Sequence, residues 1–298
     1  MSDAKNYLRN GYVHIKSPFS ESEIAKMRKA MLQGGNESSV KGIDFLLANK
    51  EIYSGQLDKT ISGRLANIFG SNYKIVNDIN IHLDQFYNDR PDKGWHIDAG
   101  AERLARYLFS SDYRFCKVGI YLQPNSKDLG GGVDVEVGGQ NSFRFFGSGN
   151  FGYFLSLSYY FFDRLFISKF RKKISVELEA GDVLVFDSRL PHRSTPKKRK
   201  REAKEPEKLV IYWQIAGDRK NAFLYLKNAM FLEFSDKGNF RHYSEYLGYH
   251  YPTDYPDEYC QLVSDNIEVV SLPGNIASRY KDKIPEGALN EVFFPEQL

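Results

Sequence analysis

Short apolar segments separated by turns make up the central part of the chain. From Tyr73 to Tyr87, apolar residues alternate with polar ones, as expected for strands with one buried face. Further apolar segments follow at 116–122, 133–137, 181–187 and 209–214, and several are bounded by turn-forming residues such as Gln123-Pro124-Asn125-Ser126 and Gly138-Gly139. Strands of this kind predict a jelly roll and not a sheet built from βαβ units.

Helical patterns precede these strands. Residues 10–15 predict a short entry strand, and Ser20 and Glu23 then have the spacing of a capping box before a helix containing Ile24, Met27, Met31 and Leu32. Residues 43–57 suggest more helix and loop, and 61–69 a short helix ended by Gly70. We therefore expect a mainly β fold with flanking helices.

The length and composition fit one large folded unit. The chain has 298 residues, of which 42% are hydrophobic and 15% aromatic, enough for a sizeable core and an aromatic pocket. We found no repeat, linker or second domain, so the prediction is a single domain over 1–298 with an aromatic and basic insert at about 150–173.

Charge, cysteines and the N-terminal residues bear on the partners and the cellular compartment of the protein. A formal net charge of +3 gives no basis for nucleic-acid binding. Cys116 and Cys260 lie far apart and fit no metal-ligand spacing, so we expect two free thiols and a reducing compartment. The residues after Met1 form no apolar signal segment, and the expected location is the cytoplasm.

A histidine and a carboxylate are two residues apart in Gly94-Trp95-His96-Ile97-Asp98. On an extended strand, His96 and Asp98 point to the same face and could be two metal ligands. Taken alone, such a pair is more often an ordinary hydrogen-bonded or surface pair.

A second histidine follows the strong apolar strand at 181–187. His192 lies where the chain could turn it back into the mouth of a barrel, although a histidine capping a loop is an equally good interpretation. Two histidines and one carboxylate leave coordination positions open, which suits Fe(II) that must bind a cosubstrate and O2. Zinc is a weaker match, because its sites are usually closed or hold three ligands and a water.

The order of these segments resembles the phytanoyl-CoA dioxygenase family of 2-oxoglutarate oxygenases. The similar segments are Gly11-Tyr12-Val13 with Phe19-Ser20, Trp95-His96-Ile97-Asp98, 132–139, 181–186 and Pro191-His192-Arg193-Ser194. The resemblance implies a double-stranded β-helix, a cupin-like jelly roll, with Fe(II) in its mouth bound by His96, Asp98 and His192. It also implies that 2-oxoglutarate chelates the iron, that O2 oxidises it to succinate and CO2, and that a substrate C–H bond is hydroxylated. Asp98 stands where halogenating relatives have a small residue, which favours hydroxylation.

The resemblance also indicates cosubstrate contacts. Ser194 matches the hydroxyl group that hydrogen-bonds the far carboxylate of 2-oxoglutarate. The family generally pairs that carboxylate with an arginine on the following strand, but here the intervening loop is enlarged by residues 197–201 and the strand starts with Lys208. Lys208 is the candidate, with Arg201 behind it, and a lysine would bind as a point charge and not as a fork.

The insert at 150–173 is rich in aromatic residues and ends in Arg171-Lys172-Lys173. It is too short to span a bilayer but could lie in a membrane interface; the alternative is a lid whose rings pack into the protein's own core. With the basic run 197–201 nearby, we expect a lipid-linked or amphiphilic anionic substrate at the inner face of a membrane. Relatives that hydroxylate the 3-deoxy-manno-octulosonic acid (Kdo) sugar of lipid A would match, and a soluble small molecule or acyl-CoA stays open.

Two other classes remain open from the sequence. A hydrolase could use the same three ligands around Zn(II), although no residue identifies its general base. A non-catalytic member of the fold could bind a ligand or partner through the aromatic insert. His82 could line the pocket, and His14, His242 and His250 are expected to have structural roles.

Overall fold

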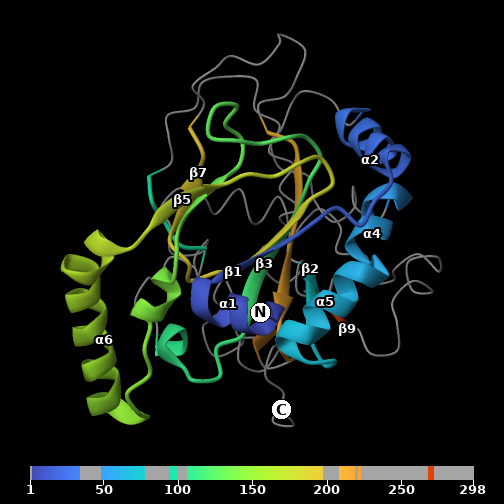
Figure 1. Cartoon of the computed structure of the whole chain (residues 1–298). Coiled ribbons are helices and arrows are strands. Elements are labelled where there is room, and N and C mark those ends of the chain that lie inside the picture. The colour runs from blue at the N-terminus through green and yellow to red at the C-terminus, as the bar shows by residue number, and fades with distance from the viewer. Residues whose placement is uncertain are drawn as a thin grey trace, which may run out of the picture.

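The computed structural model describes residues 2–33, 48–77, 94–98, 106–196, 208–218 and 221–222, and the backbone of 268–271. Its helices are α1 (Asp3–Asn10), α2 (Glu21–Gln33), α4 (Lys50–Gln56), α5 (Lys59–Phe69) and α6 (Gly149–Leu165), with 3-10 turns η1 (Arg106–Phe109), η2 (Gly139–Ser142) and η3 (Ile167–Phe170). Its strands are β1 (Tyr12–Ile15), β2 (Lys74–Asn77), β3 (Phe115–Tyr121), β4 (Val133–Glu136), β5 (Lys173–Val176), β6 (Val183–Asp187), β7 (His192–Ser194), β8 (Val210–Ala216) and β9 (Glu268–Ser271) (Figure 1).

The strands form two sheets. The large sheet has the order β1-β6-β3-β8-β2-β9, and the small sheet has the order β5-β4-β7. All neighbours are antiparallel except β2 and β9, which are parallel. Tyr121, Phe186 and Tyr212 of the large sheet pack with Val133 and Val135 of the small one, so the two sheets face each other across a shared core. The expected mainly β architecture with flanking helices is confirmed.

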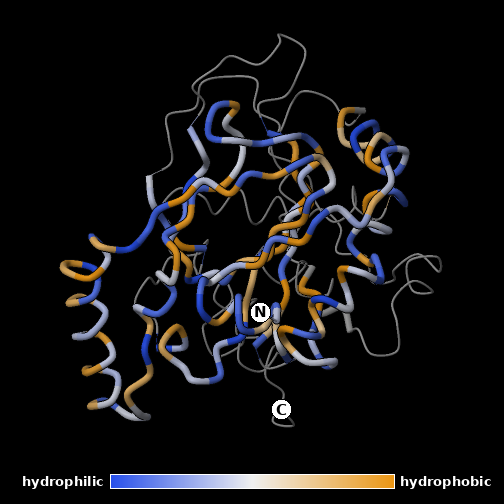
Figure 2. Tube along the Cα trace, in the orientation of Figure 1, coloured by the Kyte–Doolittle hydropathy of each residue, from blue (hydrophilic) through white to orange (hydrophobic). Residues whose placement is uncertain are grey.

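Helices cover the other face of the large sheet. Met27 and Met31 of α2 and Ile61 of α5 pack with strand residues such as Val118 and Trp213 in a second core. Figure 2 shows hydrophobic positions along the central strands, and also along α6, which lies apart from them at the left edge of the view. Because β3 and β8 are buried on both faces, their apolar runs are nearly continuous.

The predicted helix signals are confirmed at two places. The backbone N–H of Glu23 donates to the Ser20 hydroxyl at 3.3 Å, and the backbone N–H of Ser20 donates to the Glu23 carboxylate at 2.8 Å. This is the expected capping box before α2. Helix α5 ends at Gly70, as its sequence indicates.

Several elements were not predicted, among them α1 and the strands β5, β7 and β9. Helix α1 has few apolar residues, and its main packing contact is the edge of Tyr7 against Phe69, with ring centroids 5.2 Å apart. Strand β9 lies in the C-terminal part of the chain, for which the sequence predicted no element, and it extends the large sheet beside β2.

The insert is α6 followed by η3. None of the helices among the described residues is long and apolar enough to cross a membrane.

Candidate metal centre

Backbone pairing brings the two histidine segments together. The N–H of His96 donates to the carbonyl of His192, and the N–H of His192 donates to the carbonyl of His96, both at 2.9 Å. The N–H of Asp98 donates to the carbonyl of Ser188, also at 2.9 Å. Since directly paired residues of antiparallel strands point to the same face, the two imidazoles are side by side, with ring centroids 4.4 Å apart.

Three donor atoms converge at this place. Nε2 of His96 lies 3.8 Å from Oδ1 of Asp98, and Nε2 of His192 lies 3.5 Å from Oδ2 of the same carboxylate. One ligand atom from each residue lies within 4.8 Å of the other two. The structure thus brings together all three of the metal ligands expected from the sequence; that they bind a metal stays a prediction.

The second nitrogen of each imidazole already has a partner. Nδ1 of His96 donates to the carbonyl of Gly94, and Nδ1 of His192 donates to the carbonyl of Leu190, each at 2.9 Å. A proton on Nδ1 leaves the Nε2 lone pair free, and both Nε2 atoms face Asp98. Burial, and then the neighbouring His192, lower the pKa of His96, which favours the neutral ring that a metal requires.

Lys117 of β3 gives the site a positive charge. Its Nζ donates to Oδ2 of Asp98 at 2.8 Å. Burial alone would raise the pKa of the Asp98 carboxyl group, but the Lys117 ammonium and then the His192 ring lower it well below its usual value. The carboxylate is therefore ionised and ready to bind a cation at neutral pH.

Two tyrosines lie beside this lysine on the inner face of the large sheet. The Lys117 ammonium is 4.8 Å from the centre of the Tyr212 ring, and the hydroxyls of Tyr212 and Tyr121 share a hydrogen bond of 2.6 Å. Gly119 makes this packing possible, because a Cβ atom there would lie 2.5 Å from the Tyr212 ring. These rings form an apolar wall next to the three donors.

The structure describes two of the three residues expected to contact the cosubstrate, Ser194 and Lys208. Ser194 pairs with Val133 as His192 pairs with Val135, so Ser194 faces the space between the sheets, like His192. Lys208 is buried, and its ammonium lies 5.2 Å from the centre of the Tyr212 ring. The second candidate, Arg201, lies outside the described residues, as do the rest of the basic run and His82, His242 and His250.

One loop orients two of the proposed ligands. The segment 187–191 supplies the Ser188 carbonyl to Asp98 and the Leu190 carbonyl to His192. Within it, Arg189 is paired with the Asp187 carboxylate through Nη2 at 2.9 Å and stacks on Tyr113, with its guanidinium carbon 4.0 Å from the ring centre. This partly buried ion pair fixes the path of the loop into β7.

Sequence reasoning missed Lys117, Tyr121, Tyr212 and Gln214 as residues near the site. Lys117 had a detectable signal, because it is a charged residue within the otherwise apolar run 116–122. Gln214 pairs with Lys117 across β3 and β8, and its buried Oε1 has no hydrogen-bond partner among the described residues. Buried acceptors usually have a donor, so a bound molecule or a residue outside the described ranges would complete this contact.

Trp95, by contrast, faces away from the donors. It lies between the ammonium of Lys173 and the guanidinium of Arg193, each 5.3 Å from its ring. These three residues line an open pocket of about 440 Å³ on the outer side of the small sheet, together with Lys127, Asp134 and Glu177 among others. The tryptophan of the motif therefore supports the strand from outside.

Two histidines and one carboxylate therefore converge on the inner surface of a two-sheet β fold, in an arrangement that could hold a metal ion. No family model matches the chain, and no curated protein matches it in sequence. Among solved structures, the chain is similar to the non-heme alpha ketoglutarate dependent epimerase SnoN from nogalamycin biosynthesis, at 17% identity over 73% of this chain and 80% of SnoN, with a TM-score of 0.50. At this identity the likeness shows the fold. A structure of EctD from S. alaskensis with bound Fe follows at 14% identity over 73% of this chain and 76% of EctD, with a TM-score of 0.46.

Proposed function

We propose that this protein is an Fe(II)- and 2-oxoglutarate-dependent oxygenase whose iron is bound by His96, Asp98 and His192. One observation carries the proposal: the Nε2 atoms of both histidines and the Asp98 carboxylate converge, while both Nδ1 atoms are held by backbone carbonyls. Carbonyl partners of this kind orient histidine ligands and are typical of metal sites. The fold shared with SnoN supports the same class.

The donor set fits iron better than a closed zinc site. Among the described residues, the cluster contains three ligands and no fourth histidine, cysteine or carboxylate. Three facial ligands leave positions for a chelating cosubstrate and O2. When bound, Fe(II) and 2-oxoglutarate together supply O2 activation, in which oxidation of 2-oxoglutarate to succinate and CO2 drives oxidation of a substrate C–H bond.

The chain's own residues would place the reactants. Lys117 binds Oδ2 of Asp98, the oxygen nearer His192, while Oδ1 lies toward His96. Lys208 and Ser194 would bind the far carboxylate of 2-oxoglutarate by charge and by hydrogen bond. The tyrosine wall would exclude water from the reacting centre, which strengthens these polar contacts.

For the substrate, we propose an amphiphilic molecule with an unactivated C–H bond. The support is the exposed aromatic insert, which leaves the small sheet at the end where His192 lies. A lipid-linked anionic sugar such as Kdo of lipid A would fit an aromatic surface with basic ends. A soluble acyl-CoA or another small molecule is the alternative, and activity assays with each class distinguish them.

The test is succinate formation by protein purified without oxygen and supplied with Fe(II), 2-oxoglutarate and O2. We expect iron-dependent succinate that is lost in His96→Ala and Asp98→Ala and kept in Asp112→Asn, an exposed carboxylate outside the site. Calorimetric titration of the Mn(II)-loaded protein with 2-oxoglutarate gives a second readout that needs no substrate. If the protein showed no turnover and also did not bind 2-oxoglutarate, the oxygenase proposal would be rejected. Activity with Zn(II) alone would favour a hydrolase.

A further inference from the structure

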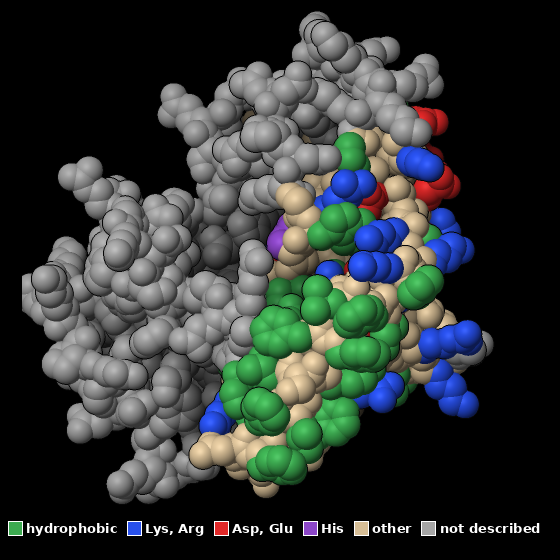
Figure 3. Space-filling view, turned by 90° about the vertical axis from the view of Figure 1, so that its left-hand side faces the viewer, with side chains coloured by type: hydrophobic (Ala, Val, Ile, Leu, Met, Phe, Trp, Pro, Cys, Tyr) green, Lys and Arg blue, Asp and Glu red, His purple; other side chains and the backbone are tan. Residues whose placement is uncertain are grey.

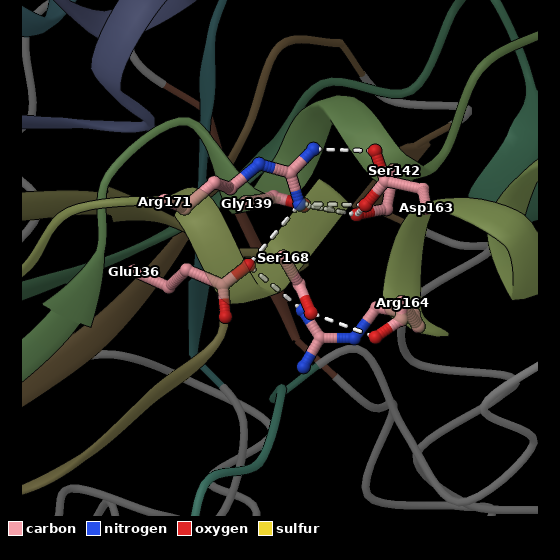
Figure 4. Close-up of polar contacts among 7 residues, drawn as sticks. All are labelled: Glu136, Gly139, Ser142, Asp163, Arg164, Ser168 and Arg171. Carbon is pink, nitrogen blue, oxygen red and sulfur yellow. Dashed lines mark hydrogen bonds and ion pairs between the residues drawn. The ribbon is translucent and has the colours of Figure 1, made fainter. Parts of the chain in front are cut away.

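Helix α6 is attached to the small sheet by a buried polar network. The guanidinium of Arg171 binds both oxygens of Asp163 at 2.6 Å and one oxygen of Glu136 at 3.1 Å, and Arg164 donates to the same Glu136 oxygen at 2.9 Å (Figure 4). Ser142 donates to Asp163 at 2.6 Å. Asp163 is 0% exposed. A network of fixed geometry holds the helix, so its outer surface is a defined one.

The face of α6 that meets the protein combines small and polar residues with two tyrosines and a leucine, and contains none of the helix's phenylalanines. Gly152, Ser156 and Asp163 are its buried residues, and a Cβ atom on Gly152 would lie 2.2 Å from the Gly147 carbonyl oxygen. Tyr153 and Tyr160 of the same face are half-buried against the core. An ordinary surface helix has polar and charged residues on its outer face, whereas the outer face of α6 has exposed phenylalanines.

The outward side of the insert carries its phenylalanines. Of the twelve large hydrophobic side chains that are exposed among the described residues, ten lie between 145 and 170, which concentrates exposed apolar surface on this one element. We call these ten the aromatic face: Phe145, Phe146, Phe151, Phe154, Leu155, Phe161, Phe162, Leu165, Phe166 and Phe170. Figure 3 shows hydrophobic side chains gathered on one side of the molecule, with lysines and arginines along parts of the edge. Since each ring has roughly 150–250 Å² of surface, the area exceeds the few hundred Å² usual for a monomer.

The charges around the aromatic face have one sign. Between 142 and 176 the sequence has six basic residues and one acidic residue, and that residue is the buried Asp163. Arg144, Lys169, Lys172 and Lys173 are exposed. Every exposed charge of this segment is therefore positive, which complements an anionic surface and repels a second copy of the same face.

The aromatic face is also linked to the proposed metal site by the register of the small sheet. The insert leaves β4 after Glu136 and returns at Lys173, and these two residues are paired. Val135, next to Glu136, is paired with His192. The insert therefore emerges from the end of the small sheet at which the distal histidine lies.

We propose that the aromatic face docks the protein on an anionic lipid membrane, with the phenylalanine rings in the acyl boundary and the four exposed basic residues on the headgroups. Apolar rings combined with basic edges are the features that hold a helix in a membrane interface. The 17-residue helix lies along the surface and does not cross it. This inference stands apart from the proposed chemistry, because docking requires neither metal nor turnover.

The test is flotation of the full-length protein with vesicles of phosphatidylcholine alone or of phosphatidylcholine and phosphatidylglycerol in equal parts. We expect binding to the anionic vesicles that weakens as salt is raised. The triple variant Phe151→Ser, Phe154→Ser, Phe170→Ser should reduce partitioning about tenfold or more. The double variant Lys169→Glu, Lys172→Glu should reduce it by a similar factor, since each lysine contributes about fivefold.

The matched controls are Leu8→Ser, an exposed hydrophobic residue on α1, and Lys29→Glu on α2. Both should bind vesicles like the wild type, and thermal unfolding should show that all variants are folded. Equal binding to neutral and anionic vesicles, or none to either, would overturn the proposal. So would a stable dimer that the triple variant dissociates without any vesicle binding, because the face would then join two copies of the chain.

Discussion

The Nζ atom of Lys117 lies 2.8 Å from Oδ2 of Asp98, so the large sheet places a positive charge beside the proposed metal ligand. With neutral histidines, an Fe(II) ion, the Asp98 carboxylate and the Lys117 ammonium together leave two positive charges at the site. The cosubstrate 2-oxoglutarate carries two negative charges. In the proposed complex, Lys117 would therefore help to balance the charge of the cosubstrate, together with Lys208 at its far carboxylate.

Replacing Lys117 by Met should weaken cosubstrate binding selectively. We expect the Kd of 2-oxoglutarate for the Mn(II)-loaded protein to rise about ten- to a hundredfold, as for loss of a charge-assisted contact, while metal affinity does not fall. Lys117→Arg, which keeps the charge, should lie closer to wild type. Calorimetry measures both constants. Loss of metal binding with unchanged 2-oxoglutarate affinity would instead show that Lys117 acts by orienting Asp98.

Lys208→Met should raise the KM for 2-oxoglutarate about tenfold or more without weakening metal binding. The reason is the loss of the buried ammonium that would pair with the far carboxylate. Ser194→Ala should have a smaller effect of a few-fold, since a neutral hydrogen bond contributes about 1 kcal/mol. Succinate assays at varied 2-oxoglutarate give both numbers. An unchanged KM in Lys208→Met would assign the contact to another basic residue.

Breaking the ion pair under α6 should destabilise the fold. Arg171→Met leaves the fully buried Asp163 without its bidentate partner, and we expect a loss of about 3 kcal/mol in the free energy of unfolding. The double variant Asp163→Leu, Arg171→Met should recover much of this loss, because no buried charge is left unpaired. Lys172→Gln, an exposed neighbour, should change stability by less than about 0.5 kcal/mol. Urea denaturation measures all three.

Asp182 should make stability depend on pH. Its carboxylate is buried and accepts from the backbone N–H groups of Ser17 and Glu179 and from His14 Nε2 at 2.6 Å. Burial would raise the pKa of Asp182, but these hydrogen bonds, that of Glu179 first, lower it below its usual value. Because the pKa is lower in the folded state, the ionised carboxylate stabilises the fold at pH values above its ordinary pKa of about 4. This stabilisation is lost as the pH falls through the pKa of the folded state.

Asp182→Asn should therefore cost about 1–3 kcal/mol at pH 7, and its difference from wild type should shrink as pH falls below about 4. Denaturation at a series of pH values tests this, with Asp112→Asn as an exposed control. A difference that stays constant down to pH 3 would assign the effect to packing and not to the charge.

Part of this architecture follows from local patterns. The alternation of side chains along a strand was enough to place His96 and Asp98 on one face, and the capping box and Gly70 were enough to locate the ends of two helices. These signals act within a few residues of one another, so a single sequence contains them in full.

The inward position of Lys117 could not be derived in the same way. Both faces of β3 are buried, one by helices and one by the small sheet, so its apolar run has no readable alternation. The orientation of α6 was equally hidden, because aromatic residues occur all around the helix. The side of α6 that faces outward depends on the contact between Arg171 and Glu136, which lie 35 positions apart on different elements.

The reciprocal backbone hydrogen bonds between His96 and His192 join two points of the chain that are 96 positions apart. A metal held by both imidazoles would therefore act as a cross-link as well as a reactive centre. Its binding energy would be shared with the pairing of these two segments, so that loss of the metal would loosen a long loop of chain. Resistance of the protein to unfolding would then report directly on whether the metal is bound.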